Sequence, residues 1–117
     1  MNWIADVLIA LVMLEHFYIL VLEMFMWTAP RTRKIFGTTP EFAEASKTMA
    51  ANQGLYNGFL AAGLLWGLIS GQQDIKVFFA ACVLVAGAYG GLTVSPRIFM
   101  VQGLPALLAL LAVLLIG

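Results

Sequence analysis

The fold of this chain is decided by residues 3–27, WIADVLIALVMLEHFYILVLEMFMW, an apolar run with a tryptophan at each end. A helix of this length rises by about 36 Å, enough to cross the hydrocarbon core of a bilayer with some tilt. Tryptophan is enriched at both membrane–water interfaces, so Trp3 and Trp27 suit the two ends of a span. We therefore predict that residues 3–27 form a transmembrane helix.

The composition of the whole chain points to the same class of protein. Of the 117 residues, 62% are hydrophobic and only 10% are charged, and the formal net charge is zero. This chain is far more apolar than an ordinary globular domain, and its balanced charge gives no field that would attract nucleic acid. We predict an integral membrane protein that has membrane lipid as its partner, does not bind nucleic acid and forms a single domain over residues 1–117.

Three further apolar stretches follow the first span, at residues 50–70, 77–94 and 97–116. Together they predict an all-α, polytopic membrane protein with a bundle of four transmembrane helices. Ser95 followed by Pro96 is typical of a helix start, so the fourth span can begin at Arg97 with a kink at Pro105. Alternatively, Pro105 starts the span and residues 97–104 lie at the membrane interface.

The connector after the first span is basic, with Arg31, Arg33 and Lys34, and therefore marks an aqueous boundary. Thr38 or Thr39 can then cap a helix that begins near Pro40 on the water side. The spacing of charged and apolar residues in its first turns predicts an amphipathic start of the second transmembrane helix.

The distribution of basic residues predicts the orientation in the membrane. Arg31, Arg33, Lys34, Lys47 and Arg97 fall on the side of the first and third connectors, whereas Lys76 falls on the opposite side. Because basic loops stay in the cytoplasm, the basic connectors should be cytoplasmic and both termini should lie outside.

Glycines recur at four-residue spacing in the second span, as Gly54 and Gly58 and again as Gly63 and Gly67. Small residues at this spacing allow two membrane helices to approach closely. These faces predict tight helix contacts, and one candidate contact is a homo-oligomer through the second helix.

Two ionisable residues, Glu15 and His16, stand side by side at the centre of the first span. Ionisable groups are costly inside a membrane and commonly mark functional sites. A carboxyl group beside an imidazole can transfer a proton, so the pair is a candidate catalytic acid–base pair. The alternative is a polar clamp between helices, with both groups neutral.

Most other polar residues of the spans fall in their cytoplasmic halves. On a helix, side chains three or four residues apart share a face, so these residues can line one pocket that opens to the cytoplasm. The candidate ligand-binding residues are Tyr18, Glu23, Asn52, Gln53, Tyr56, Asn57, Tyr89 and Gln102.

These residues do not predict a metal or a cofactor. The chain has one histidine, and its single cysteine, Cys82, lies in another span and is expected to be a packing residue. An alternative interpretation of the asparagines and glutamines is that they only bridge neighbouring helices by hydrogen bonds.

Several motifs together resemble one family. They are LEHFYILVLEMFMW at residues 14–27, TPEFAE at 39–44, AANQGLYNGF at 50–59 and QGLPA at 102–106. With the basic connector, this pattern is similar to the bacterial membrane family called domain of unknown function 1304, over nearly the whole chain. The resemblance implies a small polytopic protein of the bacterial inner membrane with no established activity, so it assigns no role to Glu15 or Asn52.

Three functions remain open at the level of the sequence. The first is a pocket around Glu15 and His16 that binds a small or amphipathic molecule and acts on it by acid–base chemistry, or only binds it. The second is a small proton-coupled transporter that uses Glu15, although the strong basic bias favours one fixed orientation. The third is a structural or assembly protein without chemistry, for which replacing Glu15 by Gln would change nothing.

Overall fold

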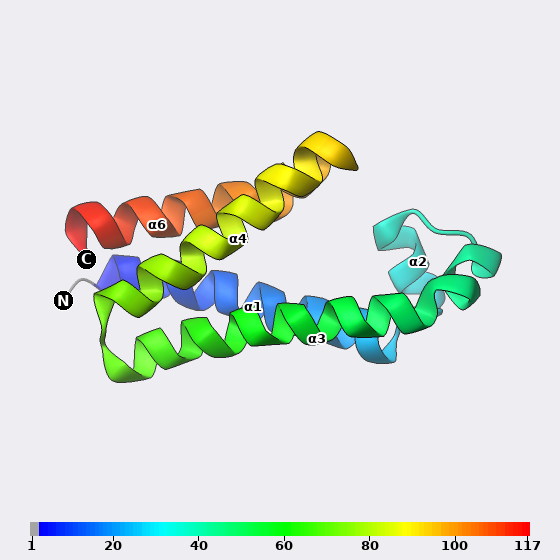
Figure 1. Cartoon of the computed structure of the whole chain (residues 1–117), viewed down its shortest axis with the longest axis horizontal. Coiled ribbons are helices and arrows are strands. Elements are labelled where there is room, and N and C mark those ends of the chain that lie inside the picture. The colour runs from blue at the N-terminus through cyan, green and yellow to red at the C-terminus, as the bar shows by residue number, and fades with distance from the viewer. Residues whose placement is uncertain (1–2) are drawn as a thin grey trace. The chain divides into compact units, whose positions relative to one another are not determined.

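A computed structural model describes residues 3–117 of the chain, and the elements within this range are helices (Figure 1). The predicted all-α class is therefore confirmed for the described residues, which contain no strand. The elements are α1 (Trp3–Phe25), α2 (Pro30–Phe36), α3 (Pro40–Ser70), α4 (Gln73–Thr93), α5 (Pro96–Ile98), the π-helix η1 (Phe99–Gly103) and α6 (Leu104–Ile116).

Three helical stretches in the described part of the chain are long and apolar enough to cross a membrane. They are α1, α4 and the run Pro96–Ile116, which joins α5, η1 and α6. Helix α3 is longer, with 31 residues, but polar residues such as Asn52 and Gln53 lower its hydropathy and it does not join this group. The predicted span at residues 50–70 consequently stays a prediction.

The start of α3 follows the predicted capping chemistry. Oγ1 of Thr39 accepts a 3.1 Å hydrogen bond from the backbone N–H of Phe42, so Thr39 rather than Thr38 provides the cap. The connector before it contains the short helix α2, which was not predicted. Helix α2 begins at Pro30 and ends at Phe36, and the next residue, Gly37, has a φ of 71° in the left-handed region that favours glycine.

The boundaries of the last two spans differ in detail from the prediction. Helix α4 begins at Gln73 instead of Val77, because Gly71, with a φ of 69°, reverses the chain within a very short turn. Oγ of Ser95 accepts from the backbone N–H of Arg97 at 3.3 Å, as expected for a cap. The helix then continues past Pro105, and its irregularity is the π-helix η1, which ends two residues before this proline. Proline has no backbone N–H to donate.

The described chain forms two compact units. Unit 1 consists of the described residues up to Leu14 together with Leu60–Gly117, and unit 2 consists of Glu15–Phe59. The boundary between the units falls within α1, after Leu14, and within α3, after Phe59, so each of these helices has a part in both units. The expectation of one domain over the whole chain stays a prediction.

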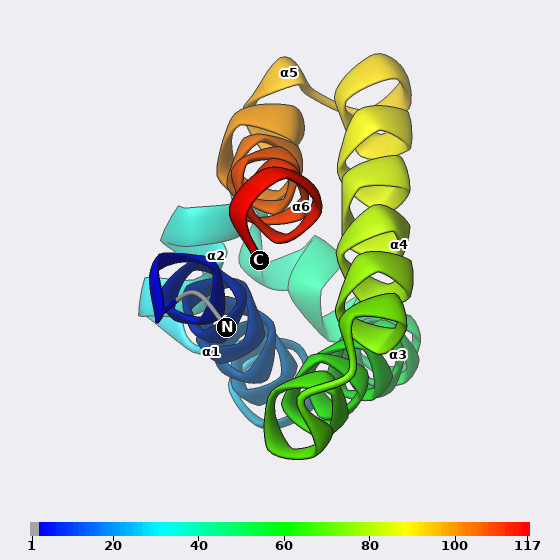
Figure 2. The ribbon, with the colours of Figure 1, turned by 90° about the vertical axis from the view of Figure 1, so that its left-hand side faces the viewer.

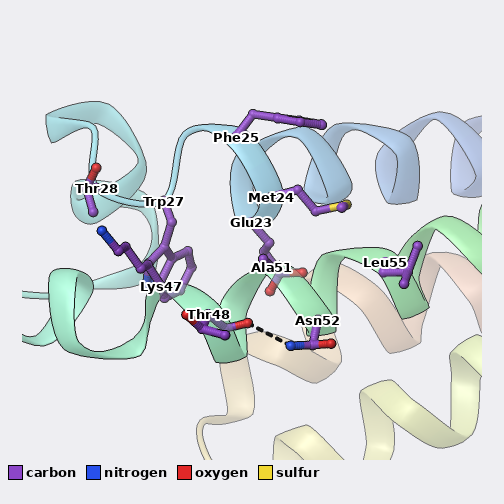
Figure 3. A pocket seen from close by; sticks show the side chains of 10 residues that line it. All are labelled: Glu23, Met24, Phe25, Trp27, Thr28, Lys47, Thr48, Ala51, Asn52 and Leu55. Carbon is purple, nitrogen blue, oxygen red and sulfur yellow. Dashed lines mark hydrogen bonds between the residues drawn. The ribbon is translucent and has the colours of Figure 1, made fainter.

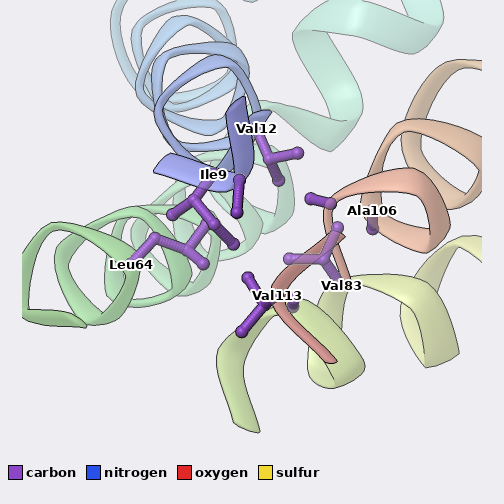
Figure 4. Packing of buried hydrophobic residues seen from close by; sticks show 9 residues of the cluster. Ile9, Val12, Leu64, Val83, Ala106 and Val113 are labelled. Carbon is purple, nitrogen blue, oxygen red and sulfur yellow. The ribbon is translucent and has the colours of Figure 1, made fainter. Parts of the chain in front are cut away.

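Unit 1 packs residues of four helices around one apolar core (Figure 4). Helix α1 contributes Ile9 and Val12, α3 contributes Leu64, and α4 contributes Val83, all of which are almost completely buried. Helix α6 lies beside α4 and adds small residues, among them Ala106 (Figure 2). Small side chains let the helix axes approach, which increases the van der Waals contact that stabilises helices in lipid.

The close helix contacts predicted from the glycines are present within the chain. In unit 2, a Cβ atom on Gly54 would lie 2.7 Å from Cγ of Met24, and one on Gly58 would overlap Leu20. In unit 1, Gly63 packs against Phe79, and Gly67 packs in the same way against Lys76. A homo-oligomer through these faces stays a prediction.

A buried ion pair fixes one end of unit 1. Nζ of Lys76 lies 2.8 Å from Oδ1 of Asp6 and 3.2 Å from Oε1 of Gln73, and Lys76 is only 4% exposed. A Cβ atom on Gly117 would also lie 2.8 Å from Nε2 of Gln73. The start of α1, the start of α4 and the end of α6 therefore share one end of unit 1 (Figure 1).

Candidate functional site

Unit 2 contains an open groove of about 460 Å³ between the last turns of α1 and the middle of α3 (Figure 3). This volume lies within the range of small-molecule sites, which usually combine apolar walls with a few polar groups. Residues lining the groove are Glu23, Met24, Phe25, Trp27, Thr28, Lys47, Thr48, Ala51, Asn52 and Leu55.

Glu23 is the buried carboxylic acid of this groove, with 8% of its surface exposed. Its Oε1 accepts a 2.7 Å hydrogen bond from Nδ2 of Asn57, which is also 8% exposed. Gly54 allows α3 to come this close, because a Cβ atom there would lie 3.0 Å from Cβ of Glu23. The neutral amide therefore fixes the position of the carboxyl group.

Trp27 forms a rigid wall of the groove. Its indole N–H donates to Oγ of Ser46 at 3.1 Å, and the Ser46 hydroxyl donates in turn to the carbonyl of Phe42 at 2.6 Å. The indole also packs against the ring of Phe36, with centroids 4.9 Å apart and planes tilted by 58°. Contacts from α2 and α3 thus hold the indole in one orientation.

Two polar residues of α3 face the groove with part of their bonding capacity already used. Nζ of Lys47 lies 2.6 Å from Oε1 of Glu44, and both side chains are exposed. Nδ2 of Asn52 donates to the carbonyl of Thr48 at 2.9 Å, as the dashed line in Figure 3 shows. An exposed ion pair of this kind contributes little to stability.

The candidate acid–base pair, Glu15 and His16, lies closer to the N-terminal end of α1 than Glu23 and does not line the groove. Nδ1 of His16 is 3.8 Å from Oε1 of Glu15. His16 is completely buried, and the side chain of Glu15 is 26% exposed. Oε1 of Glu15 is out of contact with solvent and has no hydrogen-bond partner among residues 3–117. A buried carboxyl oxygen without a hydrogen-bond partner is unfavourable, so this oxygen distinguishes Glu15 from the hydrogen-bonded Glu23.

The structure separates the predicted ligand-binding residues into several groups. Glu23 and Asn52 line the groove, and Asn57 positions Glu23. Gln53 is exposed, as are Tyr18 and Tyr56, and none of these three lines the groove. Exposure alone does not exclude ligand contact in a membrane, so their role stays a prediction.

Two predicted residues, Tyr89 and Gln102, belong to unit 1. Tyr89 is 69% exposed and lines a shallow apolar groove of about 510 Å³ on α4, together with Phe78 and the half-buried Cys82. The grouping of Tyr89 and Gln102 with the unit-2 residues stays a prediction. No group of three or more His, Cys, Asp or Glu side chains in the described range is arranged to hold a metal ion.

The sequence-based prediction missed several groove residues. From the sequence, Trp27 is interpreted only as an interface marker and Lys47 only as one of the basic residues that predict the orientation, while Thr48 carries no prediction. One signal was available, because Thr48 and Leu55 lie four residues before and three after Asn52 and therefore share its face of the helix. That spacing would have added both residues to the site.

Comparison with known proteins identifies relatives of the chain. Residues 10–114 match the family described as "Protein of unknown function (DUF1304)". The chain is 34% identical over 116 residues to "Uncharacterized protein YpaA" of Lactococcus lactis subsp. lactis (strain IL1403), and the alignment covers 96% of this chain and 98% of the relative. No solved structure matches the chain.

Proposed function

We propose that this chain, which belongs to the DUF1304 family, is a four-span membrane protein whose unit-2 groove binds the polar end of a small amphipathic molecule. The family match confirms the resemblance found in the motifs, and the family description assigns no activity. The proposal therefore depends on the chain's own residues. The observation that carries it is the open groove that contains the buried, hydrogen-bonded carboxyl group of Glu23.

The ion pair between Asp6 and Lys76 supports the four spans. It brings together the starts of α1 and α4, two of the helices that are long and apolar enough to cross a membrane. If both cross in the same direction, the chain must return between them. The 31 residues of α3 rise by about 46 Å, which is sufficient, whereas α2 has only 7 residues. We propose α3 as the second span, within the predicted bundle of four transmembrane helices.

The proposed location is the bacterial inner membrane, with the basic connectors in the cytoplasm and both termini outside. The bacterial origin of the relative supports the first part. The position of Gly117 beside Gln73, at the end of unit 1 where α1 and α4 start, supports both ends of the chain on one side of the membrane. The excess of basic residues in the connectors supports the cytoplasmic side for those connectors. Cytoplasmic basic connectors would place the groove, which Thr28 and Lys47 line, on the cytoplasmic side.

The walls of the groove suit an amphipathic ligand. Met24, Phe25 and Leu55 offer apolar contact, while Glu23 and Asn52 offer polar groups. A carboxyl group held by an amide does not have to be reoriented when a ligand binds, which lowers the entropic cost of binding. We propose the remaining predicted ligand residues of unit 2, which are Tyr18, Gln53 and Tyr56, as secondary contacts.

Acid–base chemistry at Glu15 and His16 is the enzymatic extension of this proposal. Glu15 precedes Glu23 by two helical turns, which is about 12 Å along α1. An amphipathic molecule anchored at Glu23 can span this distance. Its apolar part would then reach Glu15, whose Oε1 has no hydrogen-bond partner in the described chain and can take up a proton.

Native mass spectrometry of the gently extracted protein tests the binding function. Ala51 lines the groove, so Ala51→Phe should fill it and abolish a co-purifying small molecule. Ala62→Phe is the matched control, because Ala62 lies on an exposed position of the same helix. Loss of the ligand only in Ala51→Phe supports the proposal. A wild-type protein without any bound species, or equal loss in both variants, argues against it.

Proton-coupled transport is a second candidate function, favoured by Oε1 of Glu15, which has no hydrogen-bond partner among residues 3–117. A membrane carboxyl group that takes up and releases protons would couple solute movement to the proton gradient. In proteoliposomes, Glu15→Gln should then abolish proton flux that the wild type shows on addition of solute. If neither Glu15→Gln nor Ala51→Phe changes binding or flux, the structural role without chemistry is favoured.

A further inference from the structure

Glu23 is a buried carboxyl group without a cationic partner in the described chain. The ion pairs among residues 3–117 join His16 to Glu15, Lys47 to Glu44 and Lys76 to Asp6, and none of them includes Glu23. The hydrogen bond to Glu23 comes from the neutral amide of Asn57. A carboxylate buried without a counter-charge is unfavourable, so a bound cation would stabilise it.

The basic residue that lines the groove is paired with a carboxylate outside the groove. Lys47 lies at 2.6 Å from Glu44, and this pair is balanced in charge. When the carboxyl group of Glu23 is ionised, its negative charge is therefore not compensated by a basic side chain of the groove. Electrostatic complementarity then favours a ligand with a positive group.

The walls beside Glu23 distinguish an organic cation from a simple metal ion. Trp27 offers an indole that Ser46 and Phe36 hold in place, and Met24 and Leu55 offer apolar surface. A cation over an indole ring is attracted by the ring's quadrupole, and the attraction increases when water is excluded. No group of three metal-ligating side chains is present in the described part of the chain.

We infer that the groove selects an organic ammonium amphiphile, with its charged nitrogen against the carboxyl group of Glu23 and its first carbons against Trp27. This inference rests on the proposed binding function of the groove and names the chemical class of its ligand. The carboxyl group provides the charge, and the indole provides the adjoining surface. The apolar side chains of the groove take the alkyl part.

Calorimetric titration of the full chain in lipid nanodiscs tests this inference, with the heat of empty nanodiscs subtracted. The probes are hexylammonium, hexanol and hexanoate, which share one alkyl length and differ in charge. We expect hexylammonium to bind at least about tenfold more tightly than the other two, as for a hydrogen bond to a charged group.

Two pairs of variants locate the binding energy. Glu23→Gln keeps an oxygen that can accept a hydrogen bond from Asn57. This variant should lower the affinity for hexylammonium by at least about tenfold. Glu41→Gln removes an exposed carboxylate outside the groove and should have no effect. Trp27→Leu should lower the affinity for hexylammonium by about threefold to tenfold. Trp66→Leu, at an exposed position of unit 1, should leave this affinity unchanged.

Each outcome distinguishes the inference from the proposed function. Equal binding of hexylammonium to wild type and Glu23→Gln, with folding verified by thermal unfolding, overturns the inference. Tighter binding of hexanol or hexanoate that Ala51→Phe abolishes also overturns it but leaves the groove as a binding site. If none of the three probes binds and no molecule co-purifies with the wild type, both the inference and the proposed function are wrong.

Discussion

Nζ of Lys76 lies 2.8 Å from Oδ1 of Asp6, and this ion pair joins the first turns of α4 and α1, 70 residues apart in the chain. The side chain of Lys76 is 5% exposed, whereas that of Asp6 is 29% exposed. The two partners therefore differ in what their loss leaves behind. Removing Asp6 leaves a buried cation, while removing Lys76 leaves a carboxylate that water can reach.

Asp6→Asn is accordingly expected to destabilise unit 1 by about 3 kcal/mol or more, as for a broken buried pair. Lys76→Met should lower the free energy of unfolding by less, about 1–2 kcal/mol, because the remaining Asp6 is partly solvated. The double variant should be more stable than Asp6→Asn alone. Denaturant unfolding in detergent measures all three. Costs below about 0.5 kcal/mol for both single variants would show that the pair is not important for stability.

The proposed topology predicts that opposite ends of α3 lie on opposite sides of the membrane. In a Cys82→Ala background, Gln72→Cys should react from outside intact cells with a membrane-impermeant maleimide. Lys34→Cys should react only after permeabilisation. Both residues are exposed in the structure, so accessibility is set by the membrane. Labelling of both positions from the same side would contradict a membrane-spanning α3.

The hydrogen bond between Asn57 and Glu23 predicts a difference between two asparagines of α3. Asn57→Ala leaves Oε1 of Glu23 buried without its 2.7 Å donor and should cost about 1–3 kcal/mol. Asn52→Ala removes an exposed amide that bonds only to the preceding helical turn, so its cost should stay within about 0.5 kcal/mol. Thermal unfolding of the two variants provides the comparison, and equal midpoints would contradict it.

The contacts of α4 with α5 and η1 predict a graded effect of added methyl groups. A Cβ atom on Gly87 would lie 2.6 Å from Cα of Gly103, whereas one on Gly90 would lie 2.7 Å from the side-chain atom Cγ2 of Ile98. Backbone cannot move aside as a side chain can. Gly87→Ala should therefore destabilise the protein by about 1–3 kcal/mol and Gly90→Ala by less. Chemical denaturation in detergent checks this order, and the reverse order would contradict it.

Much of the secondary structure was predictable because its signals are local. Thr39 before Pro40 and Ser95 before Pro96 place side-chain acceptors beside unsatisfied backbone N–H groups, and both caps are present. The short helix α2 was missed because its residues were interpreted by charge alone. The irregularity near Pro105 was expected as a kink and is found as the π-turn η1.

The candidate site was predictable only in part. Glu23, Asn52 and Asn57 were identified because polar residues are unusual in apolar helices. The wall formed by Trp27 was not, since its orientation depends on Ser46 and Phe36, which reach it from other helices.

The sequence by itself determined the long helices, the apolar stretches and the family, because hydrophobic runs, caps and motifs act over a few neighbouring residues. Only the tertiary structure decided which polar groups meet. Asn57 reaches Glu23 across 34 residues, and Lys76 reaches Asp6 across 70. The reason is physical: the rotation and axial level of each helix are set by side-chain packing at contacts such as Gly54, and no local pattern in the sequence encodes them.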